Sequence, residues 1–112
     1  MTTTRQQKVS RLLQKELGDY FQKNGSRLTG GKMVTVTVVR ITPDLGLAKV
    51  YLSVFPSGER EANLETINEN SLSIRGEMGR RLRSSLKHIP DFAFYADDSL
   101  DYIDNIDSLL NE

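Results

Sequence analysis

A chain of 112 residues without cysteine suits one compact domain, and it excludes disulfide bonds, thiolate nucleophiles and cysteine-based zinc sites. The formal net charge is zero, yet residues 1–56 carry nine basic and three acidic side chains, whereas residues 90–112 carry seven acidic and no basic ones. This sorting of charge predicts a phosphate-binding surface in spite of the neutral total.

The first predicted element is an amphipathic helix over residues 5–23. Its apolar side chains recur at helical spacing and form one stripe: Val9, Leu12, Leu13, Leu17, Tyr20 and Phe21. Lys8, Arg11 and Lys15 fall together on the opposite side, with Arg5 on the flank. This basic stripe therefore faces solvent or a partner.

A flexible loop and a β-hairpin are predicted next. Residues 24–31 are rich in glycine and small polar side chains, which predicts a loop. Residues 33–41 and 47–55 alternate β-branched apolar and polar side chains, as strands with one buried face do. Pro43 and Gly46 between them supply the backbone geometry of a tight connection, so we expect an antiparallel pair.

A kinked pair of helices should follow the hairpin. Glu59 and Glu61 favour a helix start, and that helix buries Leu64 and Ile67. A second apolar stripe steps by four residues and should end before Pro90, since proline disfavours helical geometry at its predecessor. That stripe comprises Ile74, Met78, Leu82 and Leu86. Poor helix formers separate the two stripes and place the kink at Asn70, Ser71 and Leu72.

The chain should end with a third strand and an acidic helix. Residues 92–96 are short and aromatic enough for a strand, and Ser99 can cap a helix after it. That helix, over about residues 98–112, exposes aspartates and has a narrow apolar face of Leu100, Ile103, Ile106 and Leu110. The predicted fold is α+β: one domain over residues 1–112, in which helices cover one face of a three-stranded sheet.

The sequence holds little that could catalyse a reaction or bind a metal. His88 is the only histidine, and the acidic residues from Asp97 to Asp107 lack the glycine-bearing loop of a calcium site. We therefore expect neither an enzyme nor a metal or other cofactor. No apolar run is long enough for a signal peptide or a membrane span, so we expect a cytoplasmic monomer without a membrane partner.

Basic residues crowd the second helix of the kinked pair: Arg75, Arg80, Arg81, Arg83 and Lys87. Phosphate is the natural anion for such a surface, because guanidinium groups bind it bidentately and counterion release adds affinity. The alternative is a solvated helix surface neutralised by Glu77 and by the acidic C-terminal residues. For His88 we prefer the interpretation as a residue at the helix terminus that interacts favourably with the helix dipole. A phosphate contact is the weaker interpretation.

Gly76-Glu77-Met78-Gly79 has the GxxG form with which KH domains approach a nucleic-acid backbone. The acidic Glu77 would repel phosphate there. Two glycines also cost stability inside a helix, so a packing reason is the alternative, and we prefer it for Gly79.

Several segments, in this order, resemble the ribosome-binding factor A family. They are residues 5–17, 36–39 and 44–53, then Ile74-Arg75 with Gly79, and finally Pro90-Asp91-Phe92, Phe94 and residues 97–99. The resemblance implies a type II KH-like fold and a role in ribosome biogenesis, as a factor for late maturation and rRNA processing of the small ribosomal subunit in cold adaptation. It also implies an Ala-x-Gly kink between two helices, where this chain has Asn70, Ser71 and Leu72 instead.

The basic residues together with this resemblance imply a non-catalytic assembly factor that binds the small ribosomal subunit and its rRNA. The predicted RNA-binding residues are Arg5, Lys8, Arg11, Lys15, Arg75, Arg80, Arg81, Arg83 and Lys87. One alternative is a generic KH-type binder of single-stranded RNA, against which the few aromatic residues argue. The other is a protein-interaction module that offers an edge strand within residues 34–55.

Overall fold

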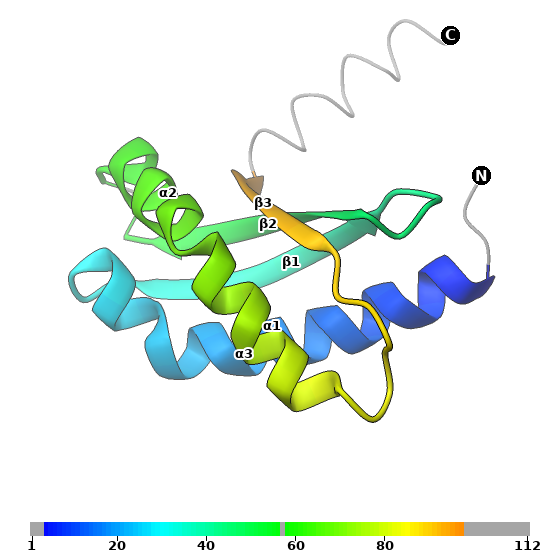
Figure 1. Cartoon of the computed structure of the whole chain (residues 1–112). Coiled ribbons are helices and arrows are strands. Elements are labelled where there is room, and N and C mark those ends of the chain that lie inside the picture. The colour runs from blue at the N-terminus through cyan, green and yellow to red at the C-terminus, as the bar shows by residue number, and fades with distance from the viewer. Residues whose placement is uncertain (1–3, 57, 98–112) are drawn as a thin grey trace, which may run out of the picture.

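A computed structural model describes residues 4–56 and 58–97, in which three helices pack against a mixed three-stranded sheet (Figure 1). The elements in chain order are α1 (Thr4–Thr29), β1 (Met33–Ile41), β2 (Leu47–Phe55), α2 (Arg60–Glu69), α3 (Ser71–Leu82) and β3 (Asp91–Ala96). This order confirms the predicted α+β fold with its antiparallel hairpin. The predicted C-terminal helix, capped by Ser99, lies outside the described residues.

The sheet has β2 at its centre. β1 pairs with it antiparallel, with Val34 opposite Val54, and β3 pairs with it parallel, with Phe94 opposite Val50. A register shift between Val36 and Val38 places an irregularity in β1. The return from β2 to a parallel β3 requires a crossover, which α2 and α3 provide.

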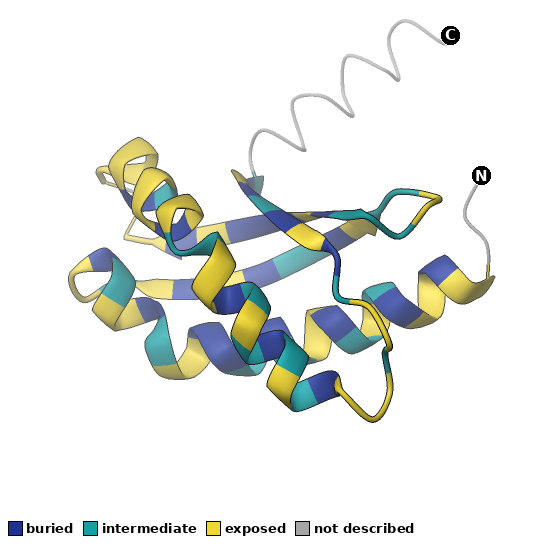
Figure 2. Cartoon of the chain, in the orientation of Figure 1, coloured by how far each residue is buried: buried dark blue, intermediate teal, exposed yellow. Residues whose placement is uncertain are grey.

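The core lies between the helices and one face of the sheet (Figure 2). Its largest fully buried side chains come from every layer: Leu13, Leu17 and Phe21 of α1, Leu52 and Val50 of β2, and Ile67, Ile74 and Met78 of α2 and α3. Phe21 meets Phe94 of β3 edge to face, with ring centroids 5.7 Å apart. Burial alternates along β3, as expected of a strand with one covered face.

The prediction of a loop over residues 24–31 is wrong, because α1 continues to Thr29. Polar side chains stabilise the extra turns from within: Asn24 Nδ2 donates to the Tyr20 carbonyl at 2.9 Å, and Thr29 Oγ1 donates to the Gly25 carbonyl at 2.7 Å. Gly25 is buried against Val34, where a larger side chain would not fit. The true turn is short and uses Gly30 and Gly31, both at positive φ.

α2 and α3 meet at Asn70, which has φ −95° and ψ 9°. Asn70 is therefore the residue between the two helices, whereas Ser71 and Leu72 already belong to α3.

The second helix ends before Pro90, as predicted, but the prediction that its apolar stripe continues through Leu86 is wrong, since α3 ends at Leu82. The amides of Ser85 and Leu86 both bond to the Leu82 carbonyl, which closes the chain into a turn. Arg83 caps the helix end, and Lys87 and His88 lie in the segment leading to β3. The five basic residues predicted to share one helix are thus divided between a helix and a loop.

Within residues 4–56 and 58–97, no helix combines the length and apolar character needed to cross a membrane.

Candidate nucleic-acid interface

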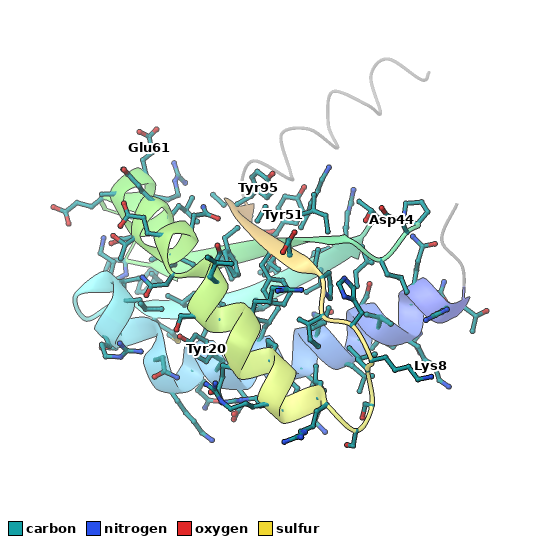
Figure 3. All side chains as sticks on the ribbon, in the orientation of Figure 1. Lys8, Tyr20, Asp44, Tyr51, Glu61 and Tyr95 are labelled. Carbon is teal, nitrogen blue, oxygen red and sulfur yellow. The ribbon has the colours of Figure 1, made fainter. Side chains whose placement is uncertain are left out.

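A groove of about 810 Å³ separates the N-terminal half of α1 from residues 85–90, the segment between α3 and β3. Six basic side chains line it: Arg5, Lys8, Arg11, Lys15, Lys87 and His88. Five apolar ones do as well: Val9, Leu12, Leu45, Leu86 and Pro90. We call this feature the basic groove, because none of the described residues that line it is acidic. Figure 3 shows Lys8 on the side of the molecule where α1 and this segment lie next to each other.

Helix α1 forms one wall of the basic groove and is fixed to the sheet by both apolar and polar contacts. Val9 and Leu13 are buried, which turns Lys8, Arg11 and Lys15 outward. Gln6 is also buried, and its Nε2 donates to the Ile41 carbonyl at the end of β1 at 2.9 Å. The basic stripe predicted from helical spacing is therefore held in place by the contacts of the opposite, buried face of α1.

The segment from Ser85 to Pro90 forms the second wall, and Arg75 holds it. Arg75 Nε donates to the Ile89 carbonyl at 3.0 Å and lies 3.5 Å from Asp91 Oδ1. The Asp91 amide donates to the Gly46 carbonyl at 2.9 Å, which joins this wall to the β1–β2 turn. Arg75 thus has partners within the protein and positions the wall rather than lining the groove.

Arg81 also has partners within the protein, and these are carboxylates. Its Nη1 lies 2.8 Å from Asp19 Oδ2 and 3.5 Å from Glu16 Oε1, and its Nε donates to Glu77 Oε2 at 3.0 Å. Hydrogen bonds from Arg81 and Lys23 lower the pKa of Asp19 below its ordinary value. Those from Arg80 and Arg81 lower the pKa of Glu77. The hydrogen bonds to Glu77 and Asp19 in turn raise the pKa of Arg81.

The structure thus divides the predicted RNA-binding residues into two groups. Arg5, Lys8, Arg11, Lys15 and Lys87 come together in the basic groove. Four others do not line it: Arg75, Arg80, Arg81 and Arg83. Of these, Arg80 pairs with Glu77 on the surface and Arg83 is exposed at the end of α3.

Sequence reasoning gave His88 little weight and missed the apolar part of the groove. Leu45 is the clearest example, because it lies in a turn between two strands, where an apolar side chain is unusual. This placement was the one signal in the sequence that could have indicated a surface role.

The GxxG sequence lies inside α3, so its backbone amides belong to a helix and not to a nucleic-acid-binding loop. A Cβ added to Gly79 would lie 3.8 Å from Ile89 Cγ1, so this glycine faces the segment that forms the second wall. In the part of the chain that the structure describes, no cluster of three or more histidine and carboxylate side chains could hold a metal ion. The acidic run after Asp97 lies outside the described residues.

Comparisons with known proteins agree with this fold. A family model described as Ribosome-binding factor A matches residues 5–110. The Ribosome-binding factor A of Christiangramia forsetii is 48% identical over 107 residues, which cover 94% of this chain and 81% of that protein.

Two structures from Thermus thermophilus share the architecture. The crystal structure of ribosome-binding factor A from this organism has a TM-score of 0.68 at 20% identity, covering 81% of this chain and 94% of that one. A homology model of ribosome-binding factor A, fitted into a cryo-EM map of its complex with the 30S subunit, has a TM-score of 0.61 at 21% identity and covers 75% and 86%. These likenesses show the fold, which is the KH-like one that the family resemblance implied.

Proposed function

Because the chain belongs to the ribosome-binding factor A family, we propose that it is a non-catalytic assembly factor that binds the small ribosomal subunit and its rRNA. It acts in the cytoplasm, during late maturation and rRNA processing. The fitted relative supports this proposal, since its complex is one with the 30S subunit. Residues 1–112 then act as one KH-like RNA-binding domain, to which residues 98–112 add an acidic end.

The main support for RNA binding is that two segments far apart in the sequence both place basic side chains in the basic groove. Lys8, Arg11 and Lys15 come from α1, and Lys87 comes from the segment before β3. Clustered cations without intervening carboxylates attract the phosphate backbone and gain affinity through counterion release. We assign the backbone contacts to these residues together with Arg5, and a supporting contact to the exposed Arg83.

The two other arginines with several protein partners act on this surface indirectly. Arg75 holds the wall that carries Lys87, and Arg81 joins α3 to α1. Removing either arginine would weaken binding by changing the shape of the basic groove and not by removing a phosphate contact. Arg80, which shares Glu77 with Arg81, contributes only a screened surface charge.

Sedimentation of the purified protein with ribosomal particles tests the proposal. The protein is mixed with small subunits, large subunits or free rRNA at two salt concentrations, and the bound fraction is measured. Selective association with small subunits that weakens at higher salt supports an assembly factor. Equal binding to any RNA would instead indicate a generic RNA binder, and no binding would leave a protein-interaction module.

A further inference from the structure

The basic groove has an apolar floor beneath its charged rim. Val9 and Pro90 are buried, and Leu12, Leu45 and Leu86 are half-buried between the basic side chains. Apolar side chains gain nothing from contact with phosphates, because phosphate oxygens remain hydrated or bind cations. A surface that binds only phosphates therefore does not require such a floor. The volume of about 810 Å³ lies within the range of sites that enclose small organic groups.

Leu45 shows that the floor is more than a by-product of packing. Its φ is 60°, in the left-handed region that glycine adopts at no cost and leucine avoids. The turn holds it there through a bond from the Leu45 amide to the Thr42 carbonyl and another from the Gly46 amide to Asp44 Oδ1. A strained apolar side chain at the edge of a positively charged groove indicates a contact with a ligand.

The part of RNA that combines apolar surface with neighbouring phosphates is an unpaired nucleotide. In a continuous A-form duplex the bases are stacked inside and cannot reach the floor of a groove, whereas a bulged base can leave the helix. Its own backbone then carries phosphates on both sides of the base. The basic groove offers cations on both sides of its floor, from Lys8, Arg11 and Lys15 on one wall and from Lys87 on the other.

We propose that the basic groove holds one unpaired nucleobase against Leu12, Leu45 and Leu86 while its rim binds the flanking phosphates. This inference rests on the proposed function and adds a structural preference to it, for RNA with an extruded base. The base is held mainly by apolar contact, since no phenylalanine, tyrosine or tryptophan is among the described residues that line the groove.

Binding to two short RNA duplexes of the same sequence, one fully paired and one with a single-nucleotide bulge, tests the proposal. The wild-type protein should bind the bulged duplex about tenfold more tightly, which is the order expected for removing one base from water. Both affinities should fall with salt, but their ratio should persist, because apolar contact is not screened.

Leu45→Gly is the decisive variant, because glycine suits the left-handed turn and removes the apolar side chain. It should reduce the preference for the bulged duplex to less than about threefold, through weaker binding of the bulged duplex. Leu86→Ala replaces it if Leu45→Gly melts at a lower temperature than the wild type. Leu72→Ala removes an exposed leucine of α3 that is not among the lining residues, and it should keep the preference.

Equal wild-type affinity for the two duplexes would overturn the inference, and so would a preference that survives removal of the apolar side chain. Either result leaves the proposed function intact if binding still depends on Lys8, Arg11 and Lys15. Loss of that dependence would instead contradict the proposed function itself, so the two failures can be told apart.

Discussion

Arg81 Nη1 donates to Asp19 Oδ2 at 2.8 Å and joins the last turn of α3 to α1. The same guanidinium contacts Glu16 of α1 and Glu77 of its own helix, and only 20% of its side chain is exposed. Three carboxylates around one partly buried arginine leave little charge for an outside partner. The contact therefore fixes how α3 packs against the helix that carries the basic stripe.

Replacing Arg81 with methionine should lower the free energy of unfolding by about 2 kcal/mol, because hydrogen bonds to charged groups are lost and the carboxylates are left close together. Urea unfolding followed by circular dichroism measures the change. Arg80→Met is the matched control, since Arg80 pairs with Glu77 of its own helix and is 71% exposed. If both substitutions had the same small effect, the contact between α1 and α3 would not contribute to stability.

The carboxylates around Arg81 also predict a dependence of stability on pH. The pKa values of Asp19 and Glu77 are lowered from 3.8 and 4.5, so both groups favour the folded state while they are ionised. Their contribution is present above these ordinary values and is lost as the pH falls through the lower values of the folded protein. The stability difference between wild type and Arg81→Met should therefore shrink below about pH 4.5. Melting temperatures of both proteins between about pH 3 and pH 7 test this, and a constant difference would contradict it.

Two glycines of α1 should respond in opposite ways to alanine. A Cβ at Gly25 would lie 2.9 Å from Val34 Cβ of β1, so Gly25→Ala should destabilise the fold by about 1–3 kcal/mol. A Cβ at Gly18 would meet no atom within 4 Å, so Gly18→Ala should stabilise the helix by about 0.5–1 kcal/mol. Thermal unfolding compares the two variants, and equal effects would mean that α1 does not contact β1 closely at Gly25.

Replacing Lys8, Arg11 and Lys15 together with glutamine should weaken binding to the small subunit. The slope of log K against log salt should fall by about two to three units, since each phosphate contact contributes about 0.7–0.9. The matched control replaces Lys23, Arg27 and Lys32 with glutamine, which changes the net charge equally at residues that do not line the groove. The proposed interface would be wrong if the two triple variants bound equally well at unchanged melting temperature.

Both strands of the hairpin could be predicted with their observed ends, because alternation of β-branched and polar side chains is a local signal. The ends of the helices could not. In the sequence Gly25 looks like a loop residue, and only its close packing against Val34 shows why the helix continues there. Leu86 has the spacing of the apolar stripe of α3, but it follows a turn and lines the groove. In both cases tertiary contacts determine where the helix ends, and the local spacing of apolar residues does not.

The candidate site was likewise predictable only where it depends on local spacing. The helical period places Lys8, Arg11 and Lys15 on one face, and the structure keeps them there. Nothing in the sequence distinguishes Arg81 from its neighbours, because its partner carboxylates Glu16 and Asp19 lie 65 and 62 residues away. Likewise, the bond from Arg75 to the Ile89 carbonyl, which sets the second wall, depends on the folded chain.

The position of β3 in the sequence also determines when the fold can be completed during synthesis. β3 comes last in chain order among the described elements, yet it contributes Phe92 and Phe94 to the core and lies beside the central strand. A nascent chain that has emerged only through α3 has the basic helix but neither a closed core nor the second wall of the groove. The basic groove is therefore complete only after translation has passed β3 and this strand has joined the sheet.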